Sequence, residues 1–177
     1  ELYDKVALYR THGITKNTDF LTKNDGGWYY EMQELGYNYR ITDIQAALGI
    51  SQLRRLDWSI QRRNEIAQKY DDSFKSLPIK IPFRNKNIRH AFHLYVIQVD
   101  ADKRKELYNF LRENNIFSQV LYIPAHTMPY YKSLGWKEGD FPVAEDYYSK
   151  CLALPMFPSL TEEEQEYVIE KICCFYN

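Results

Sequence analysis

The stretch "ELGYNYRITDIQAALG", residues 34–49, joins an aromatic, irregular segment to a strong helix start. Thr42 predicts a capping box, because its hydroxyl can accept a hydrogen bond from the amide of Gln45 while the Gln45 side chain reaches back. Asn38 and Arg40 come just before this helix, where the amide dipoles favour a negatively charged ligand. The alternative is that Asn38 closes a turn and Arg40 is an ordinary surface residue.

The apolar residues after the capping box predict one continuous helix from residue 42 to about residue 76. They recur with the spacing of one helix face, at Leu53, Leu56, Ile60, Ala67, Tyr70 and Phe74. The opposite face is basic, and we interpret it as solvated. At ~1.5 Å per residue the helix would be roughly 50 Å long, a length that tends to bridge two packed bodies.

The rest of the pattern predicts an α+β domain with a largely antiparallel sheet of three or four strands. Strands are expected at 79–83, 92–100 and 117–123. Helices that cover the sheet are expected at 102–114, 142–152 and 161–175. The last of them follows a second capping box, from Thr161 to Glu164. We therefore expect two domains, 1–52 and 53–177, the second led by the long helix.

The composition excludes two classes of partner. Hydrophobic residues make up 45% of the 177 residues, which is enough for a packed core. The 23 Lys and Arg residues are balanced by 24 Asp and Glu, so no excess of positive charge is available to neutralise nucleic acid phosphates. No apolar run reaches the ~20 residues that a membrane-spanning helix needs. We expect neither a nucleic acid nor a membrane as partner.

The chain also lacks the usual residue patterns of metal and hydrolytic sites. None of its four histidines forms a metal-binding pair, and adjacent Cys173 and Cys174 do not have zinc-ligand spacing. We interpret these two cysteines and Cys151 as reduced thiols of a cytoplasmic protein. No nucleophile elbow, Gly-rich phosphate loop or Ser/His/Asp order is present.

The second candidate site is the segment "YIPAH", formed by Tyr122, Ile123, Pro124, Ala125 and His126. It follows a predicted strand and contains a proline. Loops at strand ends are common ligand sites. From the residues alone, the segment is either such a site or an ordinary connection.

Taken in order, several motifs resemble one enzyme family. They are "ELYDKVALYRTHGI", "WYYEMQELGYNYRITDIQAALGISQLRRLD", "FHLYVIQV", "VLYIPAHTMPYY" and "FPVAEDYYSKCLALPMFPSLTEEEQEYVI". Together they resemble the C-terminal half of the DegT/DnrJ/EryC1/StrS aminotransferases, which use pyridoxal 5'-phosphate to aminate keto-sugars attached to nucleotides. The resemblance covers essentially the whole chain. It implies the small C-terminal domain of a fold type I, aspartate-aminotransferase-like enzyme, preceded by a remnant of the large α/β domain.

The resemblance also implies roles for the two candidate sites. Asn38 matches the family asparagine that reaches across a dimer interface to the cofactor phosphate or the substrate in the neighbouring active site. Arg40 belongs to the same substrate-binding segment. The residues at 122–126 match a loop that borders the nucleotide-sugar pocket. A homodimer with shared active sites is therefore expected.

Within the family, the likeness is greatest to the transaminases of pseudaminic acid and surface glycan biosynthesis. The resemblance then implies a nucleotide-linked 4-keto-6-deoxy sugar as substrate and glutamate as amino donor. The family lysine that binds the cofactor covalently matches a position upstream of Glu1, and so do the acid and the aromatic residue that hold the cofactor ring. The chain alone is expected to be inactive.

A helical pattern is already present at Glu1, so we expect the chain to be part of a larger protein. Residues 1–52 would be the remnant of the large cofactor-binding domain, and their apolar side chains, Trp28, Tyr29, Tyr30 and Ile44 among them, would seek a partner. The alternative hypothesis is a non-catalytic, stand-alone binding or scaffolding domain derived from the same family.

Overall fold

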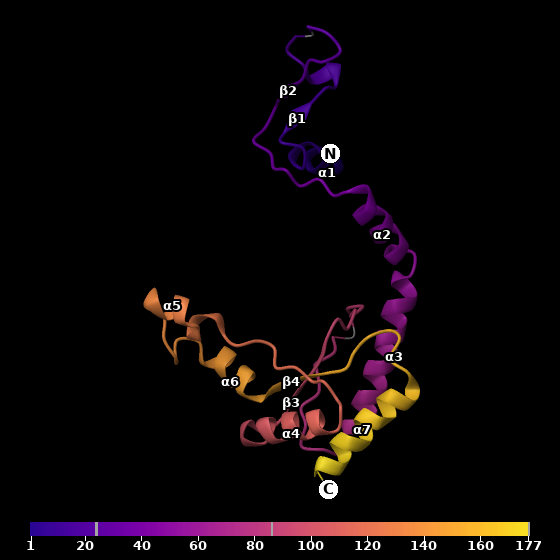
Figure 1. Ribbon diagram of the computed structural model, residues 1–177, viewed down its shortest axis with the longest axis vertical. Coiled ribbons are helices and arrows are strands. Elements are labelled where there is room, and N and C mark those ends of the chain that lie inside the picture. Colours follow the sequence, from indigo (N-terminus) through magenta and orange to yellow (C-terminus); the bar gives the residue numbers. More distant parts are fainter. Residues whose placement is uncertain (24, 86, 177) are drawn as a thin grey trace. The chain divides into compact units, whose positions relative to one another are not determined.

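A computed structural model describes residues 1–23, 25–85 and 87–176 (Figure 1). The chain forms two compact units, unit 1 from Glu1 to Arg54 and unit 2 from Arg55 to Asn177. The predicted domain boundary lies at residues 52 and 53, just before this division. Each unit is described by itself.

Unit 1 contains two helices, a 3-10 turn and a small sheet. The elements are α1 (Leu2–Tyr9), β1 (Ile14–Thr15), η1 (Thr18–Phe20), β2 (Glu31–Met32) and α2 (Asp43–Leu53). The strands pair antiparallel, with Ile14 opposite Met32. Neither α1 nor α2 buries any side chain. Unit 1 therefore depends on backbone hydrogen bonds more than on a core.

Several hydrogen bonds to the carboxylate of Glu31 tie the loop between β1 and β2 together. Its oxygens accept from the Thr22 amide at 3.0 and 2.9 Å, from the Tyr29 hydroxyl at 2.8 Å and from the Gln33 side chain at 3.1 Å. These donors favour the ionised form. Hydrogen bonds from the Thr22 side chain and amide lower the pKa of Glu31 to about 2.

We expect the loop to loosen in acid only when Glu31 is protonated. Because its pKa is lowered on folding, the stabilisation is fully present above the ordinary value of 4.5 and is lost as the pH falls toward 2. An NMR titration of the Glu31 carboxyl carbon, assigned with Glu31→Gln, should show a midpoint near 2. A midpoint near 4.5 would contradict the contacts described.

Both predicted capping boxes are confirmed. The Gln45 amide donates to Thr42 Oγ1 at 3.3 Å, and the Thr42 amide donates to Gln45 Oε1 at 2.9 Å. The Glu164 amide donates to Thr161 Oγ1 at 3.1 Å, and the Thr161 amide donates back at 3.0 Å. Each box satisfies two amides that a helix start leaves free.

The prediction of one continuous helix from 42 to 76 is wrong. Helix α2 ends at Leu53, and α3 (Leu56–Phe74) starts after Arg55, whose φ and ψ are −101° and 0°. Leu53 and Leu56 at the break are 68% and 46% exposed, so packing within their own units does not hold the backbone in one helix. The apolar spacing indicates a common face but says nothing about unbroken backbone bonds.

Unit 2 is an α+β structure, as predicted. After α3 it contains β3 (Tyr95–Gln98), α4 (Ala101–Glu113), η2 (Ala125–Thr127), α5 (Pro129–Ser133), α6 (Pro142–Lys150), β4 (Cys151–Leu154) and α7 (Glu162–Tyr176). Helix α7 contacts both α3 and α4 (Figure 1). Among the described residues, no helix is long and apolar enough to cross a membrane.

The sheet of unit 2 is smaller than predicted. Strands β3 and β4 pair antiparallel, with Tyr95 opposite Leu154. The predicted strands at 79–83 and 117–123 make only single bridges, Lys80 to Gln98 and Gln119 to Ala153. Pro82 interrupts the first segment because proline has no amide hydrogen to donate to a sheet. The prediction of three or four full strands is therefore wrong.

The helix predicted at residues 142–152 extends two residues too far at its C-terminal end. Helix α6 ends at Lys150, and the chain continues directly into β4. All four side chains of β4 are buried. A short apolar run that is buried on both sides has no periodicity that separates a strand from a helix.

The core of unit 2 lies around β3, between α3, α4 and α7. Its fully buried side chains include Ile66, Tyr70, Phe74, Tyr95, Ile97, Leu107, Leu111, Leu152 and Ile172. Two hydrogen bonds lie within this core: Gln165 donates to the Ile66 carbonyl at 2.8 Å, and the Tyr95 hydroxyl donates to Asp71 at 2.6 Å. Asp71 also pairs with Arg84 at 2.5 Å.

Replacing Ile172 with alanine should lower the free energy of unfolding of unit 2 by about 2–5 kcal/mol, because it opens a cavity at a fully buried position. Val143→Ala is the matched control, since Val143 is 83% exposed, and its effect should stay within about 0.5 kcal/mol. Urea denaturation measures both. Equal effects of the two substitutions would contradict the assigned core.

Candidate functional site

The segment around Asn38 is fastened to the end of α1 by the backbone. The Tyr37 amide donates to the Tyr9 carbonyl at 2.6 Å, the His12 amide donates to the Tyr37 carbonyl at 2.9 Å, and the Tyr39 amide donates to the Arg10 carbonyl at 2.9 Å. Residues 37–39 therefore pair with the backbone at the end of α1, residues 9–12, in the way that one strand pairs with another.

Two glycines make this close approach possible. A Cβ atom on Gly36 would lie 2.1 Å from the amide nitrogen of Gly13 and 2.8 Å from the carbonyl oxygen of Tyr9. Gly13 has φ +67°, and a Cβ atom there would lie 1.8 Å from the Glu34 carbonyl oxygen. Only residues without a side chain fit where the two backbones meet.

The side chains of the segment alternate between two sides. The rings of Tyr37 and Tyr39 stack at 4.9 Å with an angle of 8° between their planes. At the alternate positions, Arg40 Nε donates to Asn38 Oδ1 at 3.1 Å. In an extended segment, residues two apart share a side. The tyrosines therefore form an aromatic side, and Asn38 and Arg40 form a polar side.

The polar side offers hydrogen-bond donors to an anion. The contact with Arg40 uses only the carbonyl oxygen of the Asn38 side chain, and no described residue accepts from its NH2 group. Both residues are exposed. An amide NH2 and a guanidinium held together suit a phosphate or a carboxylate. These two residues therefore fit the phosphate end of a cofactor or substrate.

The second candidate segment divides into outward and inward residues. Tyr122 and Ile123 are 75% and 51% exposed, whereas His126 is buried. Pro124 and Ala125 form the start of the turn η2, in which the Thr127 and Met128 amides donate to their carbonyls. Only the outward residues, Tyr122 and Ile123, present large side chains to a ligand. His126 is engaged inside unit 2.

The partner of His126 is Glu145, at 2.7 Å between Nε2 and Oε1. The sequence analysis did not single out Glu145. The contact joins residues 19 positions apart and leaves no periodic signal. The one sequence feature near it is the acidic first turn of a helix that begins with Pro142.

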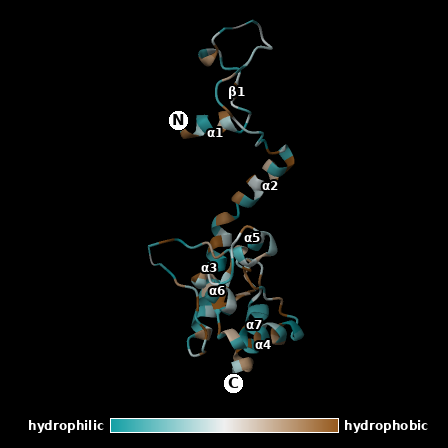
Figure 2. Ribbon diagram, turned by 90° about the vertical axis from the view of Figure 1, so that its left-hand side faces the viewer, coloured by the Kyte–Doolittle hydropathy of each residue, from teal (hydrophilic) through white to brown (hydrophobic). Residues whose placement is uncertain are grey.

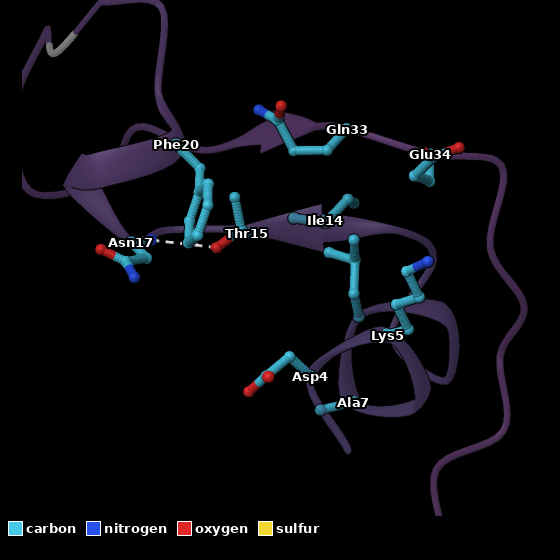
Figure 3. Close-up of a pocket in the computed structure, with 10 residues that line it drawn as sticks. Asp4, Lys5, Ala7, Ile14, Thr15, Asn17, Phe20, Gln33 and Glu34 are labelled. Atoms are coloured by element: carbon cyan, nitrogen blue, oxygen red, sulfur yellow. Dashed lines mark hydrogen bonds between the residues drawn. The ribbon is translucent and has the colours of Figure 1, made fainter. Parts of the chain in front are cut away.

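The structure places the two candidate segments in different units, with Asn38 and Arg40 in unit 1 and residues 122–126 in unit 2. Neither segment lines the hollow of about 520 Å³ in unit 1, which lies between α1, β1 and the residues after β2 (Figure 3). Its lining includes Lys5, Ile14, Phe20 and Glu34. Across the part of the chain that the structure describes, no group of three or more potential metal ligands occurs.

Comparison with known proteins identifies the family. Residues 1–173 match the sequence model of the DegT/DnrJ/EryC1/StrS aminotransferase family. The chain belongs to this family. The predicted resemblance is confirmed, and it extends over nearly the whole sequence.

Similar curated proteins include bacterial proteins of sugar and polysaccharide biosynthesis. The spore coat polysaccharide biosynthesis protein SpsC of Bacillus subtilis is 44% identical over 97% of this chain and 46% of its own length. The UDP-4-amino-4,6-dideoxy-N-acetyl-beta-L-altrosamine transaminase of Campylobacter jejuni is 34% identical over 95% of this chain and 43% of its own length. The chain thus spans about half the length of these relatives.

Solved structures of family members share the fold. The putative sugar aminotransferase Spr1654 of Streptococcus pneumoniae superposes with a TM-score of 0.83 at 29% identity, over 99% of this chain and 43% of that one. Helicobacter pylori PseC superposes with a TM-score of 0.80 at 28% identity, over 99% and 46%. Spr1654 is also known in PMP and PLP forms, which implies pyridoxal phosphate as the cofactor of the family.

Gly36→Ala should release the Asn38 segment from α1, since no room exists for its Cβ atom. Amide hydrogen exchange at His12, Tyr37 and Tyr39 should become at least tenfold faster. Gly49→Ala in α2 is the control, because a Cβ atom there meets nothing within 4 Å and alanine favours the helix. Unchanged exchange in Gly36→Ala would contradict the described packing.

Proposed function

We propose that the chain is the C-terminal part of a pyridoxal-phosphate-dependent aminotransferase that acts on a nucleotide-linked 4-keto-6-deoxy sugar. The family match over residues 1–173 carries the proposal. Residues 1–52 would belong to the large cofactor-binding domain and residues 53–177 to the small domain. Glutamate would donate the amino group, in the biosynthesis of pseudaminic acid or a related surface glycan.

The relatives support a nucleotide sugar as the substrate class. Besides the altrosamine transaminase of Campylobacter jejuni, they include the GDP-perosamine synthase of Escherichia coli O157:H7, at 33% identity over 99% of this chain. The names of both products contain a nucleotide and an amino sugar. The nucleotide differs between them, so the choice of UDP rests on the likeness of the motifs to the pseudaminic acid enzymes.

The chain would contribute two binding elements to the active site. Asn38, with its free NH2 group, and Arg40 would hold an anionic group of the cofactor or substrate in the neighbouring subunit of a homodimer. The loop at 122–126 would border the nucleotide-sugar pocket through exposed Tyr122 and Ile123. Bound pyridoxal phosphate supplies the electron sink that amino-group transfer requires.

Part of the surface of unit 1 also fits a place inside a larger assembly. Trp28, Tyr30 and Ile44 are 73%, 54% and 83% exposed, and Figure 2 shows hydrophobic segments along α2. Large exposed apolar surface usually marks an interface with a partner protein. A non-catalytic, stand-alone domain is not favoured, since the family is one of aminotransferases and the relatives include sugar-nucleotide enzymes.

In the complete protein, Asn38→Ala should weaken binding of the cofactor or nucleotide sugar about ten- to a hundredfold, the loss expected for one hydrogen bond to a charged group. Equilibrium titration measures it. Asn87→Ala is the control, because Asn87 is also exposed and belongs to neither candidate segment. Equal affinities in both variants would remove Asn38 from the site.

Mixed dimers test whether the contact crosses the subunit interface. An Asn38→Ala subunit paired with a subunit that lacks the cofactor-binding lysine has one site with both defects and one site with neither. Mixing the two inactive variants should therefore restore about half of the activity per mixed dimer. If mixed dimers form and no activity returns, Asn38 does not act in the neighbouring subunit.

A further inference from the structure

We propose that Glu145 is a positioning residue, which fixes the ligand-facing loop at 122–126 by holding His126. The inference rests on the proposed function, because it assigns Glu145 a part in shaping the nucleotide-sugar pocket. Helix α6 supplies the residue, and η2 supplies its partner.

One carboxylate of Glu145 joins two loops. Its Oε1 atom lies 2.7 Å from His126 Nε2 and accepts from the Gly139 amide at 2.8 Å. The Phe141 amide donates to the same oxygen at 3.4 Å, and Oε2 lies 3.1 Å from the Gly139 nitrogen. Glu145 thus connects the turn that contains His126 to the turn that precedes α6.

The charge of Glu145 determines whether the hydrogen atom in this contact belongs to His126 or to Glu145. The contact with His126, followed by the Gly139 amide, lowers the pKa of Glu145, so the carboxylate is ionised at neutral pH. An ionised carboxylate only accepts hydrogen bonds. The Nε2 atom of His126 therefore carries the hydrogen and donates it, which fixes the orientation of the ring.

Aromatic rings cover this contact, and the neighbouring charges are occupied elsewhere. Phe141 lies 4.8 Å from the His126 ring, between ring centroids, and Trp136 lies 5.5 Å from Phe141. Lys132 pairs with Glu138 at 2.8 Å, and on α6 Lys150 pairs with Asp146 at 2.6 Å. Both lysines thus have carboxylate partners other than Glu145.

The two ends of the ligand-facing loop are attached to the two ends of α6. Glu145, in the first turn of α6, holds His126 at the end of the loop. Cys151, the residue directly after α6, donates from Sγ to the carbonyl oxygen of Leu121 at 3.3 Å, at the start of the loop. Between these attachments lies exposed Tyr122, at 75%. A rigid helix therefore sets the distance between the loop ends and limits where Tyr122 can lie.

Hydrogen exchange of the 177-residue chain tests the attachment without any ligand. Glu145→Ala should speed exchange at least tenfold in peptides that cover 121–128 and 136–142, because losing hydrogen bonds to a charged group releases both turns. Asp146→Asn, on the next residue of α6, is the control and should leave both peptides unchanged. Unchanged exchange in Glu145→Ala overturns the proposal.

Two further measurements exclude a merely structural effect. Peptides from α3 should exchange as in the parent chain, which shows that the core is intact. Glu145→Gln keeps one oxygen that can accept from Gly139 or His126 but loses the charge, so its exchange should lie between that of the parent chain and that of Glu145→Ala. If Glu145→Ala does not fold, Glu145→Gln against Asp146→Asn decides, with faster exchange at 121–128 expected only in Glu145→Gln.

Kinetics of the complete enzyme separate this proposal from the proposed function. Glu145→Ala should raise KM for the nucleotide sugar about tenfold or more while leaving KM for glutamate unchanged. If the loop loosens but both KM values are unchanged, Glu145 does not position the pocket and the proposal is wrong. If no nucleotide sugar is aminated by the parent enzyme, the proposed function fails, whereas the exchange result still decides the attachment of the loop.

Discussion

Complete burial of β4 is the constraint on which the functional part of unit 2 depends. Its four side chains are all buried, and its backbone pairs with β3 along the whole strand. The strand begins at the residue where α6 ends, so burying it fixes the end of that helix. It also bridges to Gln119, three residues before the ligand-facing loop at 122–126. The core thereby fixes β4 and the end of α6, next to which both ends of the loop are attached.

Unit 1 is stabilised differently, because it has few buried side chains. Its central contact is the close approach of the backbone at Gly36 to the backbone at Gly13, which the absence of side chains at both residues permits. This approach holds Asn38 and Arg40 together on one side of an extended segment. Several large apolar residues of α1 and α2 remain exposed, among them Leu2, Val6, Ile44 and Leu48, as the proposed place in a larger protein would require.

The sequence predicts the features that depend on short-range hydrogen bonds and spacing. Both capping boxes and the start of α6 at Pro142 follow from residues within one turn of each other. The family resemblance adds the order of the motifs. Asn38 and the 122–126 loop are found in accessible segments, but their roles stay predictions.

The sequence does not predict features that depend on long-range packing. The break at Arg55 lies where Leu53 and Leu56 are exposed, and β4 is a strand with both of its faces covered. Glu145 escapes prediction because its partner lies 19 residues away and the pair has no motif. Each of these features requires knowledge of which surfaces meet.

Transfer of a labelled amino group tests the central claim most directly. The complete protein should be incubated with pyridoxal phosphate, 15N-glutamate and a UDP-linked 4-keto-6-deoxy-N-acetylhexosamine, and the sugar product should be analysed by mass spectrometry. The account predicts a 4-amino sugar nucleotide that carries the 15N label. A folded protein that binds pyridoxal phosphate but labels neither this sugar nor any other nucleotide-linked keto-sugar would contradict it.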